Sequence, residues 1–388
     1  MTKVRLLMIL ITLIIIGVFG TIGILFARGY RFDTEKLELL PKGLLVANSE
    51  PNGAQVYVDG KLETATNATI SLSPGPHAVE IKKEGFLTWQ KTIEVAKEEV
   101  TQVDAFLVST APNLSALTFS GAINPVSNKD LTSIAYAIAP NGDNGEKAGL
   151  WVIETVNLPL GFNRSSRQIT NGDLTEATWE WSPNGSEILL TTSEGAFLLD
   201  ASKYTPQNQL VNIITELNDI SRAWEEENQK QIESRLEKLP DELAQIFEKS
   251  AKGILFSPDE DRILYTASGS ASIPEGFIDP LPGASTQKEE REITDGNTYV
   301  YDTKEDKNFK VGTSNDIIHW LPNSVNLISP KENEIKVMDY DGTNNLTVFS
   351  GNYSFPHAYS SSSANRILIL TNLGAQDSPT NLYWLGLR

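Results

Sequence analysis

The chain has 388 residues, no cysteine and three histidines, and its formal net charge is −18. The absence of cysteine excludes a disulfide framework, a thiolate metal site and a cysteine nucleophile. All 50 acidic residues lie from Asp33 onward together with 28 basic ones, so this part has a net charge of −22, which repels phosphate backbones and disfavours nucleic-acid binding.

After a short tail of residues 1–5, an uncharged and mostly apolar run extends from Leu6 to Ala27. Its length suits a helix that crosses a bilayer. A cleaved signal peptide has an apolar region of about 7 to 15 residues and a small-residue cleavage site. Because this run is longer, we expect a retained transmembrane helix. Basic residues flank both ends, so charge does not decide the orientation. A polar linker is expected over residues 28–42.

Residues 43–110 are expected to form a small β-sandwich. Gln55–Val58 alternates apolar and polar side chains, as a half-buried strand does, and Asp59-Gly60 follows it as a hairpin signal. The same alternation returns in His77–Lys82 after a turn rich in proline and glycine. These short strands between strong turns predict an all-β unit.

Four segments of this unit together resemble a PEGA domain: Glu50–Ala54, Val56–Gly60, Leu72–His77 and Glu84–Phe86. The resemblance covers roughly residues 43–108. The stretch that matches the motif naming the family departs from it and reads Glu-Pro-Asn-Gly-Ala here. PEGA domains resemble surface-layer and envelope modules of prokaryotes, which implies a body outside the cytoplasmic membrane.

From Ala116 onward a pattern repeats: an aromatic strand end, a proline turn and then an apolar strand. The strongest copies are Trp181–Gly185, Phe256–Asp259 and Trp320–Asn323, and two weaker ones precede Ile134 and Ile367. Proline presets the first φ of such a turn, and Asn, Asp or Gly tolerates its second corner. The five copies resemble Tol-type and WD-like propeller repeats across residues 116–388.

A further strand is expected after each copy, and a fourth strand after four of them. The expected fourth strands are Gln168–Thr170, Leu210–Ile214, Phe309–Val311 and Leu346–Phe349. Leu117–Phe119 is expected to close the ring as the fourth strand of the last sheet, which removes an exposed edge. We therefore expect a mainly β protein whose residues 111–388 form a propeller of five or six blades.

Two insertions interrupt the repeat. Residues 215–252 carry apolar side chains at helical intervals and predict a helical hairpin, with Asp241 as the cap of its second helix. This hairpin either packs passively on its own blade or docks a partner. Residues 269–297 are rich in Pro, Gly, Ser and charge, so a mobile loop is expected there.

Motifs for catalysis or metal binding are not found in the sequence. His77, His319 and His357 have no metal-ligand spacing, and neither a serine elbow nor a phosphate-binding loop is present. Asp339–Asn345 resembles a calcium loop but lacks the distal glutamate, so a plain turn is favoured. The tryptophans at repeat positions are expected to pack in the core rather than bind sugar. We assign no catalytic, cofactor-binding or metal-binding residue.

These observations predict a non-enzymatic binding or scaffolding protein of the cell envelope. We expect a single-pass protein of the cytoplasmic membrane, anchored through Leu6–Ala27, with its β domains on the extracytoplasmic side. The expected partner is an envelope protein or a cell-wall glycan, held by the propeller loops. The alternative is an envelope hydrolase or lyase whose carboxylates come from several blades over the propeller channel and leave no local motif.

Overall fold

The computed structural model describes residues 3–27, 30–33, 38–140, 142–156, 166–278, 285–375 and 378–388. The chain separates into two compact units. One comprises Met1–Leu107 and Asp279–Gln287, and the other comprises Val108–Ile278 and Lys288–Arg388. The residues assigned to the first unit therefore include part of the second predicted insertion.

The apolar run near the N-terminus forms a single helix, α1 (Lys3–Ala27). The helix begins inside the expected tail, because Lys3 and Arg5 already have helical backbone. Its Leu7–Leu25 stretch is long and apolar enough to cross a membrane, and none of this stretch is buried in the described chain. Such an apolar surface requires lipid or another apolar partner.

The expected linker contains a short antiparallel pair of strands, β1 (Tyr30–Asp33) and β2 (Glu38–Pro41), with Arg31 opposite Leu40. This differs from the plain polar connector that composition suggested. Aromatic residues at positions 30 and 32 favour extended backbone and help to explain the strand. Residues 28, 29 and 34–37 lie outside the described part.

The β-sandwich is confirmed. Its strands are β3 (Gly43–Glu50), β4 (Gln55–Val58), β5 (Lys61–Ala65), β6 (Ala68–Leu72), β7 (Gly75–Lys82), β8 (Trp89–Val95) and β9 (Val100–Phe106). They form the sheets β6-β3-β9 and β5-β4-β7-β8. Leu45, Val56, Ile81 and Trp89 are buried in one shared core, as the period-two pattern predicts. Asp59 and Gly60 join β4 to β5 with positive φ angles of 51° and 80°, as the expected hairpin turn requires.

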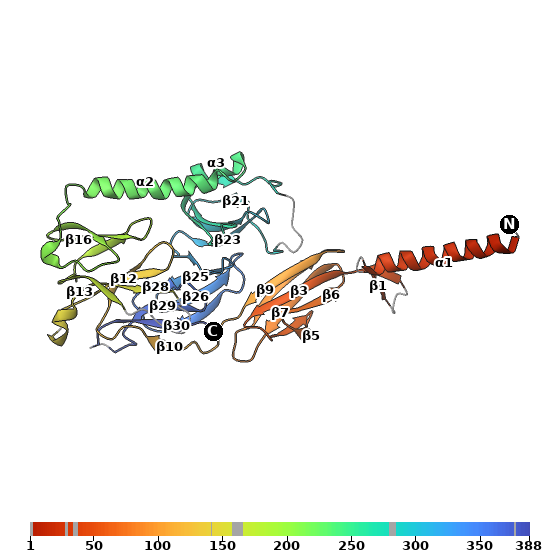
Figure 1. Cartoon of the computed structure of the whole chain (residues 1–388), viewed down its shortest axis with the longest axis horizontal. Coiled ribbons are helices and arrows are strands. Elements are labelled where there is room, and N and C mark those ends of the chain that lie inside the picture. Colours follow the sequence, from red (N-terminus) through yellow and green to blue (C-terminus); the bar gives the residue numbers. More distant parts are fainter. Residues whose placement is uncertain are drawn as a thin grey trace. The chain divides into compact units, whose positions relative to one another are not determined.

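In its described residues the second unit has five antiparallel sheets of three or four strands, which are called blades 1 to 5 in chain order (Figure 1). Blade 1 is β11 (Ile123–Ser127), β12 (Ser133–Ile138), β13 (Gly149–Glu154) and β14 (Arg167–Asn171); blade 2 is β15 (Thr178–Trp181), β16 (Glu187–Thr192) and β17 (Gly195–Asp200). Blade 3 is β18 (Ala251–Phe256), β19 (Arg262–Ala267), β22 (Asn297–Asp302) and β23 (Lys307–Thr313). Blade 4 is β24 (His319–Trp320), β25 (Asn326–Lys331), β26 (Glu334–Asp339) and β27 (Leu346–Ser350). Blade 5 is β28 (Ala358–Ser360), β29 (Arg366–Thr371), β30 (Asn381–Gly386) and β10 (Leu114–Ala116).

Strand β10 begins the unit yet pairs with β30 at its end, so it closes the ring as expected. The closing strand lies just before the predicted Leu117–Phe119. The Leu117 and Thr118 amides still donate to the Leu382 carbonyl, at 2.8 and 3.3 Å, but Phe119 is 83% exposed. Apolar clusters join blade 1 to blade 2, blade 3 to blade 4, and blade 5 to blade 1. The propeller fold predicted from the repeats is confirmed.

Blade 2 has three strands, and the fourth strand expected at Leu210–Ile214 is irregular backbone. Asn212 explains the difference. Its side chain accepts a hydrogen bond from the Ile214 amide and donates one to the Glu194 carbonyl. A short polar side chain that bonds nearby backbone competes with a strand ladder. One ladder-like bond remains, from the Ile213 amide to the Ala196 carbonyl.

The first insertion forms two helices, α2 (Leu217–Leu236) and α3 (Asp241–Ser250), as predicted. Pro240 occupies the N-cap position of α3, and Asp241 is the first residue of the helix. Among the described residues, no side-chain hydrogen bond caps α3, so the cap predicted at Asp241 is not formed. Two short 3₁₀ helices, Gly142–Lys147 and Gln207–Gln209, complete the helical content of the unit's described residues. Hydrogen bonds connect α2 to the turn of blade 1 through Lys129, and ion pairs connect its C-terminal end to the turn of blade 3 through Glu260.

The second insertion is more structured than the expected loop. It contains the short pair β20 (Ala271–Ser272) and β21 (Glu292–Ile293). Buried Asp306 accepts hydrogen bonds from the Gly276 and Phe277 amides, at 2.9 and 3.1 Å, and forms an ion pair with Arg291. Composition did not reveal this arrangement, because its partner, Asp306, lies outside the insertion. Residues 279–284 lie outside the described part.

Candidate functional site

In blades 2 and 3 the repeated proline turn is built by its serine. In blade 2, Ser182 Oγ accepts a hydrogen bond from the Glu187 amide at 2.9 Å and donates one to Asn184 at 2.8 Å. In blade 3, Ser257 Oγ likewise accepts from the Arg262 amide at 2.9 Å. The serine therefore fixes where the second strand of a blade begins and which residue stands there.

The residue that begins the second strand faces the residue that ends the third. These facing pairs are Glu187 with Asp200 in blade 2, Arg262 with Asp302 in blade 3, and Asn326 with Asp339 in blade 4. In blade 4 the Asn326 amide donates to Asp339 at 2.8 Å. In blade 3 the same position places a guanidinium against a carboxylate, so the repeat here creates a buried ion pair.

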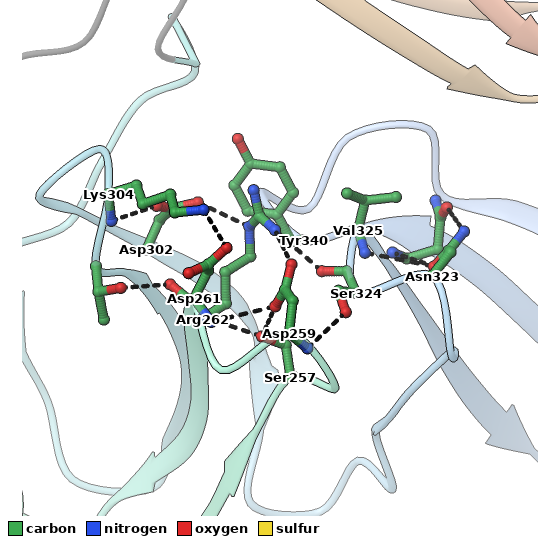
Figure 2. Close-up of polar contacts among 12 residues, drawn as sticks. Ser257, Asp259, Asp261, Arg262, Asp302, Lys304, Asn323, Ser324, Val325 and Tyr340 are labelled. Carbon is green, nitrogen blue, oxygen red and sulfur yellow. Dashed lines mark hydrogen bonds and ion pairs between the residues drawn. The ribbon is translucent and has the colours of Figure 1, made fainter. Parts of the chain in front are cut away.

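Figure 2 shows the cluster around this ion pair. Arg262 Nε lies 2.7 Å from Asp302 Oδ2, although the two atoms lack the alignment of a hydrogen bond, and the Asp302 side chain is fully buried. The guanidinium carbon of Arg262 lies 4.2 Å from the centre of the Tyr340 ring. Arg262 Nη1 donates to the Ser324 carbonyl at 3.2 Å. Ser324 and Tyr340 belong to blade 4, so the cluster joins two blades.

Ion pairs link the charged side chains of the cluster. Burial disfavours the charged form of Arg262, but Asp302 and further acidic neighbours outweigh this, so the pKa of Arg262 is raised. Asp259 is a second, looser partner of Arg262 at 3.7 Å, and Asp261 pairs with Lys304. Each of these three carboxylates has a cationic partner within blade 3, and Arg262 reaches blade 4 through Ser324 and Tyr340.

The three histidines are not brought together. His77 lies in the β-sandwich, where Nδ1 is 2.7 Å from Asp59 and Nε2 is 2.8 Å from the Ser73 carbonyl. Burial lowers the pKa of His77, but these two hydrogen bonds outweigh it, and the pKa is raised. His319 is exposed in β24, and His357 Nδ1 is 2.9 Å from the Tyr359 hydroxyl. Local partners explain the positions of His77 and His357.

The calcium-like stretch forms the turn between β26 and β27. Asp341 accepts hydrogen bonds from the amide and the hydroxyl of Thr343, and Asp339 accepts one from Asn344 at 2.9 Å. These carboxylate oxygens are used inside the turn, which supports the turn interpretation. Within the described ranges, no three His, Asp or Glu side chains gather closely enough to hold a metal ion.

The repeat-position tryptophans connect neighbouring blades. Trp181 of blade 2 donates its indole N–H to the Val126 carbonyl of blade 1 at 2.9 Å, and Trp320 of blade 4 donates to the Leu255 carbonyl of blade 3 at 3.0 Å. Both side chains also pack against apolar clusters that span two blades. Their packing role is the one predicted from the repeat.

The Arg262 cluster was missed at the sequence level. A signal was present, because the third strands of blades 2, 3 and 4 all end in aspartate: Asp200, Asp302 and Asp339. When an apolar strand repeatedly ends in a carboxylate, we expect that carboxylate to face a polar or charged partner on the neighbouring strand. The cation opposite it could have been located by counting five residues from the turn serine to Arg262.

A comparison with protein-family models matches residues 42–111 to the PEGA domain. Residues 42–111 are a PEGA domain. The match agrees with the sandwich expected over residues 43–110. A search of curated proteins finds no significant match. An apolar N-terminal helix followed by a PEGA domain fits an envelope-associated protein.

Solved structures with some similarity include an acylaminoacyl peptidase from Pyrococcus horikoshii, at 15% identity and a TM-score of 0.22, over 69% of this chain and 38% of that one. The β-propeller domain of Myceliophthora thermophila Swd1 is similar at 10% identity and a TM-score of 0.25, over 68% of this chain and 83% of that one. A putative TolB from Agrobacterium tumefaciens is similar at 12% identity and a TM-score of 0.21, over 90% of this chain and 100% of that one. The chain thus spans about two fifths of the peptidase that it matches.

Proposed function

We propose that this is a membrane-anchored binding or scaffolding protein of the cell envelope. Helix α1 holds it in the cytoplasmic membrane, and the PEGA domain and propeller lie on the extracytoplasmic side. The propeller presents loops and inserted helices to a partner, which is an envelope protein or a cell-wall glycan. Rigid β scaffolds commonly carry binding residues on their loops.

The observation that carries this proposal is the unburied apolar stretch Leu7–Leu25 of α1, followed by a PEGA domain. A signal sequence has the same composition, but its apolar region spans about 7 to 15 residues. The length of α1 therefore favours a retained anchor. PEGA domains are often extracellular, which supports the extracytoplasmic side.

A non-catalytic role is part of the proposal. The carboxylates around Arg262 support it, because Asp259, Asp261 and Asp302 are each paired with a cation. A general acid or base needs a carboxyl group that can exchange a proton with a substrate. The ion pairs give these three carboxylates a structural use that needs no catalytic role.

Protease shaving of intact cells tests the location. We expect peptides from Gly43–Arg388 to be released into the medium and identified by mass spectrometry, while a cytoplasmic control protein stays intact. The remaining N-terminal fragment is expected to resist alkaline extraction from membranes, as an anchored helix does. Protection of the β domains until lysis would contradict the extracytoplasmic side. Recovery, from cells not treated with protease, of a chain that already lacks α1 would contradict the anchor.

A further inference from the structure

Helices α2 and α3 and strand β18 enclose an open groove of about 540 Å³. Its apolar lining includes Ile232, Leu236, Phe247, Ile254 and Leu255. Its polar lining is formed by Gln229, Glu233, Glu248 and Lys252. The groove is therefore an apolar trough with acidic side chains and one lysine beside it.

The groove exists because the two faces of blade 3 are covered differently. Leu264 and Val300 face the cluster shared with blade 4. The alternate residues Tyr265 and Tyr301 face a cluster that contains Leu236 of α2 and residues of α3. The two inserted helices thus cover one face of blade 3, and their edge against β18 leaves the trough open.

Strand β18 leaves its side chains open at this place. Two residues, Gly253 and Ile254, lie opposite Tyr265, so the strand bulges, and Gly253 has a positive φ of 61°. A Cβ atom added at Gly253 would meet no atom within 4 Å. Leu255, just beyond the bulge, is 41% exposed. Such bulges redirect side chains and often lie beside functional sites.

The first strand of blade 1 shows what a covered bulge looks like. Strand β11 bulges between Ile123 and Val126, but Pro125 there is buried and its carbonyl accepts a hydrogen bond from Tyr359 of blade 5. In β18 the Leu255 carbonyl is bonded to Trp320, whereas its side chain remains in the open groove. The apolar surface of β18 is therefore available to another molecule.

The charge of the surface around the groove favours a positively charged partner. Residues 215–252 contain ten acidic and six basic side chains. Arg235 and Lys238 are held by Glu260 and do not line the groove. Glu233 and Glu248 lie at the groove itself. In a chain with a net charge of −18, this surface attracts cations.

We propose that this groove binds a segment of another protein in which an apolar side chain stands next to lysine or arginine. The apolar side chain would fill the trough over Leu255, and the cation would pair with Glu233 or Glu248. A second copy of this chain fits poorly, because it carries the same negative charge. The inference rests on the proposed binding role and adds a place and a class of partner to it.

A displayed library of random peptides, selected on the full chain in nanodiscs of zwitterionic lipid, tests the inference. We expect enrichment of sequences with Lys or Arg beside a large apolar residue. Leu255→Asp places a charge on the trough floor, and the double variant Glu233→Lys with Glu248→Lys reverses the acidic charge; each should weaken the selected peptides by about tenfold or more. The matched control, Glu225→Lys with Glu242→Lys, makes the same charge change away from the groove lining and should alter binding by less than about twofold.

The results that would contradict the groove differ from those that would contradict the binding role. Failure to enrich any peptide, or peptides that bind the groove variants as tightly as the unchanged chain, would overturn the groove. In the second case the binding role would stand, since the peptides would bind elsewhere. A concentration-dependent dimer that Leu255→Asp abolishes would replace the foreign partner with a second copy. Protease shaving tests the proposed location independently of all these outcomes.

Discussion

At the scale of single residues, the ion pair of Arg262 and Asp302 is expected to contribute strongly to propeller stability. Asp302→Ala leaves a buried guanidinium without its carboxylate and removes the acceptor of the Lys304 and Glu305 amides. Breaking a buried pair in this way costs about 3–5 kcal/mol. Urea unfolding, followed by tryptophan fluorescence, measures the loss.

The neighbouring pair of Asp261 and Lys304 supplies the control, because the Lys304 side chain is 60% exposed. Asp261→Asn is expected to cost less than about 1 kcal/mol. Equal losses for Asp302→Ala and Asp261→Asn would show that burial of the carboxylate is not what makes the first pair important.

His77 gives the PEGA domain a pH-dependent contribution to stability. Its pKa is raised above the ordinary value of 6.5, so the folded domain holds this proton more tightly than the unfolded chain. The contribution is complete below that ordinary value and is lost as pH rises through the raised pKa. Because the Asp59 side chain is 56% exposed, we expect an effect of about 1 kcal/mol or less.

Urea midpoints of the PEGA transition at about pH 6 and about pH 8 measure this effect. His77→Gln should flatten the difference between the two midpoints. The pKa of Asp59 is lowered mainly by its hydrogen bond to His77, so its own contribution is lost at acidic pH, as pH falls through that lowered value. A midpoint for the unchanged chain that rises with pH over this range would contradict the assignment.

At the scale of elements, Phe247 is the side chain that docks α3 on blade 3. It is fully buried, and its ring meets Tyr265 edge-on at 5.0 Å between centroids. Phe247→Ala is expected to cost about 3–5 kcal/mol through lost burial and the cavity that remains. Hydrogen exchange should quicken in α2 and α3, whereas the exposed-face change Gln245→Ala should leave it unaltered. Unchanged exchange in Phe247→Ala would mean that the helices dock by other contacts.

The elements that sequence reasoning predicted best are those whose pattern is local. The third strands and the proline turns are examples, since alternation and the turn serine determine them within a few residues. The strand predicted at Leu210–Ile214 does not form, because the Asn212 side chain bonds the backbone of Glu194 and of Ile214. The order within the second insertion was not predicted, because Asp306, which accepts hydrogen bonds from its backbone, lies beyond its end. Long-range partners leave no periodic signal in the segment that they order.

The candidate site was harder to predict than the strands for the same reason. Arg262 and Asp302 are forty positions apart, and they meet because the pairing of β19 with β22 places them opposite each other. The groove is still harder to predict from the sequence. Its lining comes from two helices and a bulged strand, and the sequence gives their periodicity but not the space left between them.

At the scale of the whole molecule, the propeller depends on a strand from its own beginning. Bonds from the Gly386 amide to the Asn113 carbonyl and from the Leu117 amide to the Leu382 carbonyl bracket β10. Antiparallel pairs alternate between bonded and non-bonded positions, so Ser115, midway between Asn113 and Leu117, directs its amide toward Trp384. Proline at position 115 removes that donor, and β30 then presents an edge that can pair with other chains.

Ser115→Pro is therefore expected to destabilise the propeller by at least about 1 kcal/mol, the value of a lost backbone hydrogen bond. It should also cause concentration-dependent association, measured by light scattering during heating, because the opened sheet edge offers unpaired backbone groups. Ser115→Ala keeps the amide and should behave like the unchanged chain. If Ser115→Pro kept the same unfolding midpoint and stayed monomeric, the ring would be held by contacts between blades alone. The apolar cluster that joins blade 5 to blade 1 would then be sufficient for closure.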